Sequence, residues 1–234
     1  MSADDGVDIR VTVAPGKPSA DEHALRSTLL DTLRAMGKAR LNVGTAGNAS
    51  ARLRAGKMLI SPSGVPAERC RSEDMAVVDA EGRHAGPLAP SSEWQLHRDI
   101  YAAFPAAGAV LHAHPPFATA LACQRIEIPP FHYMIARFGG TTVRCARYAT
   151  FGTQALSDAA VTALQDRNTC LLANHGMVVF GRDLGHALAL AIEFETLCEQ
   201  YWRTLQLGPP VLLSEAEMAE VIERFRWYGT ARRS

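Results

Sequence analysis

Apolar residues recur along most of the chain with the spacing of helices or of short strands. Apolar positions three or four residues apart predict helices over about residues 19–37, 91–104, 153–165 and 183–205, and a last helix after Ser214. Apolar runs bounded by turn residues predict strands at about 49–53, 58–60, 75–79, 108–111 and 141–145, and on both sides of His175. A short helix should follow Pro115 and Pro116. Because strands and helices alternate, the pattern predicts a single α/β domain.

The first residues do not follow this pattern. Residues 1–18 contain two prolines and show little periodicity, which predicts a loosely ordered N-terminal extension. The segment Ser19-Ala20-Asp21-Glu22 has the form of a capping box and predicts the start of the first helix. We therefore expect one domain over residues 19–230.

Composition excludes several classes of protein. The 234 residues have zero formal net charge and a pI near 7.1, so nothing draws the chain to nucleic acid or to an anionic membrane. No run approaches 18 apolar residues, and the acidic start is not a signal peptide. Five cysteines without a C-x-x-C motif indicate reduced, buried thiols. We expect a soluble, cytoplasmic protein.

Three histidines form the strongest chemical signal in the chain. His112 and His114 end an apolar run, and residues two apart in a strand point to the same face. His175 follows a second apolar run and precedes a glycine. Three imidazoles without an obligate fourth ligand are typical of a catalytic zinc site that keeps a position open for substrate. We therefore predict a metal site, although isolated histidines near strand ends often serve only in packing.

Three turns rich in small residues could hold a phosphate group. They are residues 44–50, 61–64 and 90–92, and each offers backbone N–H groups without bulky side chains. Ser91 and Ser92 should also lie at a helix N-terminus, which favours anions. Each turn alone is explained as an ordinary turn or helix cap, but their recurrence before the histidines favours phosphate binding.

Two other candidate residues, Glu93 and Tyr133, each allow a structural and a catalytic interpretation. Glu93 could be a helix-dipole partner or a general acid/base beside the metal. Tyr133 could donate a proton to an oxyanion or be a packed aromatic residue. Three lysines, all in turn-like contexts near glycine, make Schiff-base chemistry unattractive. No metal-ligand spacing links four further histidines, and surface or helix-face roles suffice for them: His23, His84, His97 and His186.

Several motifs, in this order, resemble the class II aldolase/adducin family over about residues 22–229. They are Gly47-Asn48-x-Ser50, Ser61-Pro62-Ser63-Gly64, Pro90-Ser91-Ser92-Glu93-Trp94, His112-x-His114, His132-Tyr133-Met134-Ile135-Ala136, Tyr148-Ala149-Thr150-Phe151-Gly152-Thr153 and His175-Gly176. The resemblance implies a central, mainly antiparallel sheet with helices on both faces. It also implies a homotetramer with active sites at the subunit interfaces.

The resemblance assigns roles to individual residues. His112, His114 and His175 would hold Zn²⁺, with Mn²⁺ or Co²⁺ as other possible ions, and Glu93 would be the acid/base and an additional ligand in the absence of substrate. Tyr133 would act on the aldehyde side of a neighbouring subunit's site, and Tyr228 would lie on a C-terminal tail over the site. The residues that would bind the substrate phosphate are Asn48, Ser63, Gly64, Ser91 and Ser92.

The implied activity is the reversible cleavage of a ketose 1-phosphate, such as L-fuculose 1-phosphate. The products would be dihydroxyacetone phosphate and an aldehyde such as lactaldehyde, formed through a metal-stabilised enediolate. A pentulose-phosphate 4-epimerase or a sugar-acid phosphate decarboxylase of the same family is the alternative, and a thiosugar-phosphate dehydratase is a further one. An adducin-like interaction module is disfavoured because such modules lose metal-binding histidines, and all three are present here.

Overall fold

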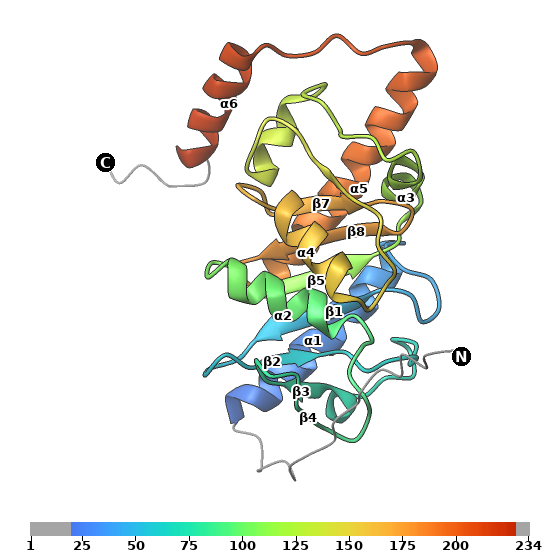
Figure 1. The fold of residues 1–234 in the computed structure, drawn as a ribbon, viewed down its shortest axis with the longest axis vertical. Helices are drawn as coiled ribbons and strands as arrows, with labels where there is room; N and C mark the ends of the chain where they lie inside the picture. Colours follow the sequence, from blue (N-terminus) through green and yellow to red (C-terminus); the bar gives the residue numbers. More distant parts are fainter. Residues whose placement is uncertain (1–19, 228–234) are drawn as a thin grey trace, which may run out of the picture.

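One mixed sheet forms the centre of the molecule in the computed structural model, which describes residues 20–227 (Figure 1). The expected extension over residues 1–18, Ser19 of the expected capping box and Tyr228 lie outside this range. The strands of the described part are β1 (Asn48–Arg52), β2 (Met58–Ile60), β3 (Ala76–Val78), β4 (His84–Ala85), β5 (Ala109–Ala113), β6 (Cys145–Ala146), β7 (Thr169–Leu172) and β8 (Gly176–Gly181).

The strand order is β4-β3-β2-β1-β5-β8-β7-β6, so strands from both halves of the chain meet at β5. All neighbouring pairs are antiparallel except β6 and β7, which are parallel. The mainly antiparallel sheet expected from the family resemblance is thus confirmed.

Different helices cover the two faces of the sheet (Figure 1). The helices are α1 (Ala20–Lys38), α2 (Trp94–Ala103), α3 (Pro116–Cys123), α4 (Gln154–Ala163), α5 (Leu184–Leu207) and α6 (Glu215–Trp227), with 3₁₀ turns η1 (Ser72–Asp74) and η2 (Tyr133–Phe138). Helices α1 and α5 pack on one face, and α2 and α4 on the other. The α/β fold with helices on both faces is therefore confirmed.

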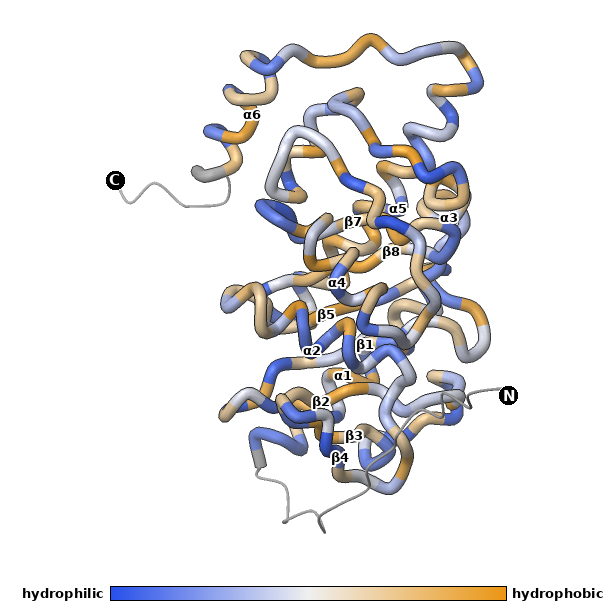
Figure 2. The backbone as a smooth tube through the Cα atoms, viewed as in Figure 1, coloured by the Kyte–Doolittle hydropathy of each residue, from blue (hydrophilic) through white to orange (hydrophobic). Residues whose placement is uncertain are grey.

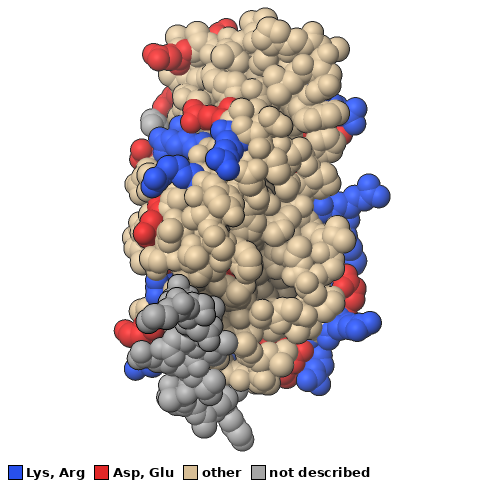
Figure 3. Space-filling view, turned by 45° about the vertical axis from the view of Figure 1, so that its right-hand side comes forward, with Lys and Arg blue, Asp and Glu red and all other residues tan. Residues whose placement is uncertain are grey.

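Alternating side chains of the central strands fill two cores. In β5, Leu111 belongs to the core shared with α1 and α5, whereas Val110 belongs to the core shared with α2 and α4. Figure 2 shows hydrophobic stretches of the backbone running through the central strands. On the face seen in Figure 3, charged side chains gather near the margins and leave a broad central area without them.

Two expected elements differ from the structure. The helix expected from Ser91 begins at Trp94, because the backbone of Glu93 (φ −99°, ψ 18°) is not yet helical. The strand expected over residues 141–145 is reduced to Cys145–Ala146, since Val143 leaves the sheet to pair with Ile128 in an isolated bridge. The capping box of the last helix is confirmed: Ser214 N–H donates to Glu217 Oε2 over 2.7 Å, and Glu217 N–H donates to Ser214 Oγ over 3.3 Å.

Two further observations concern the burial of the cysteines and the hydrophobicity of the helices. All five cysteines are free thiols, but only Cys70, Cys170 and Cys198 are buried, while Cys123 is exposed and Cys145 is half-buried. The expectation that all five are buried is therefore wrong, because the side chain of Cys123, in the last turn of α3, faces solvent. Within residues 20–227, no helix has both the length and the apolar character needed to cross a bilayer.

Candidate active site

The three predicted histidine ligands lie together where β1, β5 and β8 meet. His112 on β5 is paired with Asn48 on β1 and with Val178 on β8. His114 lies just after the end of β5, and His175 lies in the turn between β7 and β8. One nitrogen from each imidazole lies within 4.8 Å of the others. The clustering predicted from the H-x-H spacing is confirmed.

The three imidazole rings meet edge to face, with centroids 4.6–4.8 Å apart. His112 Nδ1 lies 2.9 Å from the carbonyl oxygen of Met177, which can only accept a hydrogen bond. In neutral His112 the proton is therefore on Nδ1, and the lone pair of Nε2 points into the cluster. That Nε2 lies 2.8 Å from Nε2 of His114. The backbone of β8 thus holds His112 in the tautomer that a metal ligand needs.

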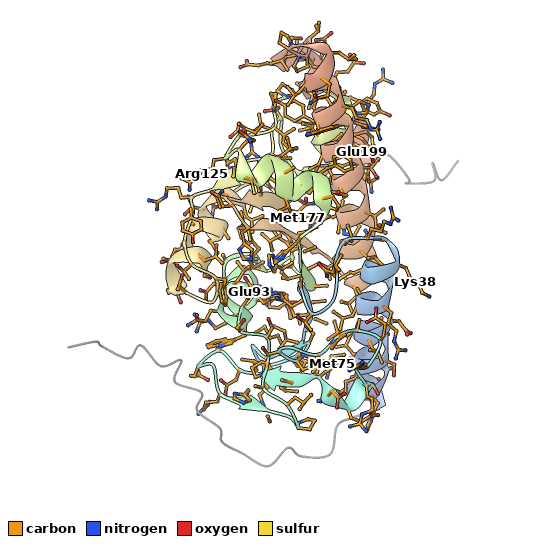
Figure 4. The ribbon with its side chains drawn as sticks, turned by 90° about the vertical axis from the view of Figure 1, so that its right-hand side faces the viewer. Lys38, Met75, Glu93, Arg125, Met177 and Glu199 are labelled. Atoms are coloured by element: carbon orange, nitrogen blue, oxygen red, sulfur yellow. The ribbon has the colours of Figure 1, made fainter. Side chains whose placement is uncertain are left out.

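Glu93 brings a carboxylate to this cluster from the N-cap position of α2. Its Oε2 lies 3.1 Å from His112 Nε2, and its Oε1 lies 3.5 Å from His175 Nε2. Glu93 is 7% exposed, and within residues 20–227 its Oε1 has no hydrogen-bond partner. In Figure 4, Glu93 and Met177 lie near the middle of the molecule, whereas Lys38 and Arg125 project from its surface. The carboxylate is therefore directed inward, toward the histidines.

Burial and the neighbouring histidines act in opposite directions on the charge of Glu93. Burial raises the pKa of Glu93, but the contacts with His112, His175 and Asn48 outweigh it and hold the pKa well below its usual value. Burial lowers the pKa of His112, yet the nearby Glu93 carboxylate raises it above its usual value overall. Burial and repulsion from His112 and His175 lower the pKa of His114 to about 4, and burial and repulsion from His112 lower that of His175 to about 4. Near neutral pH, Glu93 is thus ionised and His114 and His175 are neutral.

These residues fit a divalent transition metal. The lone pair of His112 Nε2 faces the carboxylate of Glu93 and the imidazole of His114, so several electron-rich atoms converge at one point. A cation among the nitrogens would satisfy them together with the unpartnered Oε1 of Glu93. Three imidazoles and a carboxylate suit zinc and related ions.

The structure brings the three small-residue turns together beside the histidines. Ser91 N–H donates to the Ser61 carbonyl over 2.9 Å, and Pro62 and Pro90 form a β-bridge. Ser61 N–H in turn donates to the Ala49 carbonyl over 3.0 Å, next to Asn48. A small cleft adjoins the first two turns and is lined by residues that include Asn42, Gly44, Thr45, Gly47 and Ser61.

The candidate phosphate residues differ in exposure. Ser63, Gly64 and Ser92 are exposed, whereas Asn48 and Ser91 are buried beneath them. Gly64 has a φ of +70°, and nothing lies within 4 Å of the position of its missing Cβ, so its backbone is open to a ligand. The three turns contain no lysine or arginine, so N–H and hydroxyl groups would have to bind an anion. Ser91 and Ser92 precede helix α2 instead of forming its first turn.

Tyr133 does not join this cluster within the described part of the chain. It begins η2, its side chain is 50% exposed, and its ring stacks on those of His132 and Phe225. Phe225 belongs to α6, which packs against η2 beyond the end of the sheet (Figure 1). The structure therefore does not place Tyr133 beside the histidines of its own chain.

His97, which the sequence pattern assigned only to a helix face, is fully buried beneath Glu93. Its Nδ1 lies 2.7 Å from Ser50 Oγ, and its Nε2 lies 2.5 Å from Asn48 Oδ1. Asn48 Nδ2 donates to Glu93 Oε2 over 3.0 Å. The spacing of Glu93, His97 and Tyr101, each four residues after the last, could have indicated that these polar groups share one face of α2.

Comparison with known proteins agrees with this geometry. The model of the class II aldolase and adducin N-terminal domain matches residues 27–202. A 5-methylthioribulose-1-phosphate/5-deoxyribulose-1-phosphate aldolase from Rhodospirillum rubrum is 50% identical over 206 residues, which cover 88% of this chain and 93% of that protein. An L-fuculose phosphate aldolase from Escherichia coli is 41% identical over 210 residues, covering 89% and 97% of the two chains.

A solved structure shows the same fold. A structure of L-fuculose 1-phosphate aldolase superposes with a TM-score of 0.85 at 35% identity, covering 90% of this chain and all of the other. The match in sequence extends over the strands, turns and helices that hold the histidine cluster. The chain belongs to the class II aldolase and adducin family.

Proposed function

We propose that the protein is a zinc-dependent aldolase that reversibly cleaves a ketose 1-phosphate to dihydroxyacetone phosphate and an aldehyde. The observation that carries the proposal is the position of Glu93. Its unpartnered Oε1 faces the histidine cluster, and its backbone directly follows the candidate phosphate-binding serines. A metal-held carbonyl, a base and a phosphate subsite are the parts that this reaction requires.

The phosphate turns set the position of the substrate in this proposal. Ser63, Gly64 and Ser92 offer exposed donors for the phosphate, with Asn48 and Ser91 beneath them. A phosphate held there leaves the adjoining carbons of dihydroxyacetone phosphate to lie toward Glu93 and the histidines. Contacts to the phosphate stabilise the bound substrate and the transition state equally. They orient the reacting carbon without taking part in the chemistry.

His112, His114 and His175 would hold the metal, whose Lewis acidity makes the carbon next to the ketone acidic. In the cleavage direction, the C4 hydroxyl loses its proton to solvent through Tyr133 as the bond between C3 and C4 breaks, and the electron pair of that bond passes to C3 and the ketone. Glu93 takes up a proton from solvent and delivers it to C3. In the synthetic direction, ionised Glu93 removes that proton, and its depressed pKa keeps it ready to accept.

Tyr133 has the complementary role in the proposal, at the aldehyde oxygen. Its phenol is a neutral donor at pH 7, suited to protonating that oxygen as the new carbon–carbon bond forms. Because Tyr133 is half exposed and lies away from its own histidines, we assign it to the site of a neighbouring subunit in a homotetramer. Tyr228, outside the described residues, is assigned to the tail over that site.

Two substrate classes compete. L-Fuculose 1-phosphate would give lactaldehyde, whereas 5-deoxyribulose 1-phosphate or its 5-methylthio analogue would give a shorter or a sulfur-bearing aldehyde without the 2-hydroxyl of lactaldehyde. The 50% identity to the Rhodospirillum rubrum protein favours the deoxyribulose class, and the 35% and 41% identities to fuculose-phosphate aldolases support the other. All three substrates share the dihydroxyacetone phosphate half.

The proposal is tested by incubating the metal-loaded protein with all three ketose 1-phosphates. Release of dihydroxyacetone phosphate is followed with a coupled dehydrogenase. We expect release from at least one of them, and little from the same sugar without its phosphate, because losing several charge-assisted hydrogen bonds costs several kcal/mol, roughly 2 kcal/mol for each. No release from any phosphorylated sugar, with metal bound, would overturn the proposed function.

A further inference from the structure

A line of polar side chains crosses the otherwise apolar core between the sheet and α2. Asn48 and Ser50 share one face of β1, and His97 and Tyr101 lie one turn apart on α2. Ser50 Oγ lies 2.8 Å from the hydroxyl of Tyr101. The surrounding side chains are apolar, such as Ile60, Ile100 and Val110. Buried polar groups of this kind are costly unless every one is hydrogen-bonded in a consistent direction.

The direction of this line follows from its end at Glu93. An ionised carboxylate can only accept, so Asn48 must turn its NH₂ group toward Glu93 Oε2 and its Oδ1 toward His97. His97 must then carry its proton on Nε2 to donate to Oδ1. Its Nδ1 is left with a lone pair, which accepts from the hydroxyl of Ser50. Ser50, having used its proton, accepts from Tyr101.

His97 remains neutral in this arrangement. Burial, together with repulsion from His112, lowers its pKa to about 3. A neutral imidazole has one donor and one acceptor, so the tautomer of His97 couples the orientation of the Asn48 amide to the hydroxyl of Ser50. In the other tautomer, the lone pair of Nε2 would face Asn48 Oδ1, and the amide would have to turn its own oxygen toward the Glu93 carboxylate.

We propose that His97 is a positioning residue that locks the orientation of the Asn48 amide and, through it, the Glu93 carboxylate. Oε2 is held by Asn48, and Oε1 alone is left to exchange a proton with substrate. Ser50 donates to Nδ1 and so fits this tautomer of His97, and His97 itself touches neither metal nor substrate. The role in proton transfer rests on the proposed function, whereas the tautomer does not.

Nuclear magnetic resonance of protein labelled with ¹⁵N-histidine tests the tautomer without any substrate. We expect His97 to show a protonated Nε2 and a bare Nδ1 from pH 6 to pH 8, with the signals assigned by their loss in His97→Gln. A protonated Nδ1, or a doubly protonated ring in this range, would overturn the proposal. This result stands even if the protein proves to have another substrate.

The positioning role is tested with two variants of the same residue. His97→Gln keeps a donor and an acceptor on the side chain, whereas His97→Leu has a similar volume and neither. We measure the exchange of the C3 proton of dihydroxyacetone phosphate with deuterated water, which needs no aldehyde. His97→Leu should lower the exchange rate by about 10²-fold, the usual effect of a small misplacement, while His97→Gln should restore most of it.

Two measurements separate positioning from folding. Ser157→Ala, on α4, removes another fully buried hydroxyl, which donates to Asp99 of α2 over 2.6 Å, and it should leave exchange unchanged. Metal content should be equal in all variants. Equal losses of exchange in His97→Gln and His97→Leu would overturn the positioning role, as would an undiminished rate in His97→Leu. Absence of exchange in the unaltered protein would instead overturn the proposed function.

Discussion

The chemistry of single residues in this site depends on which atoms are left without donors. Nε2 of His112 and Oε1 of Glu93 both point into the histidine cluster, and the backbone of Met177 holds the only proton of neutral His112 on the opposite nitrogen. A metal ion would be a common partner for these atoms, because it can bind the lone pairs of the three imidazoles and of Oε1 together.

Replacement of His112 should therefore abolish stoichiometric metal binding. The unaltered protein should contain about one transition-metal ion per chain, and His112→Ala well below that after dialysis, as measured by elemental analysis. His23→Ala, at an exposed position on α1, is the matched control and should keep its metal. A His112→Ala protein that retains one ion per chain would contradict the assignment.

Glu93 and Tyr133 should separate the two halves of the reaction. Glu93→Gln should abolish both proton exchange at C3 and cleavage, because the amide cannot accept that proton. Tyr133→Phe should lower cleavage by roughly 10²–10⁴-fold, the usual contribution of one positioned proton donor, while sparing exchange. Both rates are measured on the same preparations. Full exchange in Glu93→Gln would reduce Glu93 to a metal ligand or a helix cap.

At the scale of elements, the turn that carries His175 must approach β5 closely. A Cβ on Gly176 would lie 2.4 Å from the carbonyl oxygen of Ala113 and 2.8 Å from Cδ2 of His114. Only glycine therefore allows β8 to begin beside the end of β5 and bring His175 to the other two histidines. The backbone oxygen cannot move without disturbing the pairing of the two strands.

Gly176→Ala should consequently lower both stability and metal affinity. We expect a loss of about 1–3 kcal/mol in the free energy of unfolding, as for other overpacked sites, measured by urea denaturation. Gly185→Ala is the matched control, because its Cβ would meet only Asp183 Oδ1 at 3.5 Å. It should stabilise by about 0.4–1 kcal/mol by restricting the unfolded chain. A Gly176→Ala protein of unchanged stability would show that β8 can shift at no cost.

Helices and strands whose apolar residues have the spacing of the buried face were predictable from the sequence. The histidines on these elements could therefore be placed as well. Helix α5 has a buried face of regular spacing, and β5 is flanked by strands on both sides, so the H-x-H motif could be placed on a face. The 3₁₀ turn η2 was not predicted. The reduction of the strand expected over residues 141–145 to β6 was not predicted either, because it follows from a tertiary contact, the bridge of Val143 to Ile128. The role of His97 was also missed, since its partners come from β1, some 47 residues away.

At the scale of the whole molecule, the proposed function requires an assembly of several chains. In that proposal Tyr133 would serve the site of a neighbouring chain, so each complete site would take its glutamate from one chain and its tyrosine from another. Mixed oligomers of Glu93→Gln and Tyr133→Phe chains should then regain part of the cleavage activity that both pure variants lack. Native mass spectrometry, expected to show four chains, confirms that the mixed species forms. Mixed tetramers without recovered activity would show that each chain supplies both residues to one site.

Strand β5 has neighbours that leave the ribosome at very different times. Strand β1 precedes it in the chain, but β8 follows only at Gly176–Gly181. Until β8 emerges, a nascent chain carries two of the three imidazoles and an apolar strand with one open edge, which is a template for pairing with other chains. Docking of β8 closes that edge and delivers His175 in one step. If the three histidines bind a metal as proposed, the complete site forms only when this open edge has been covered.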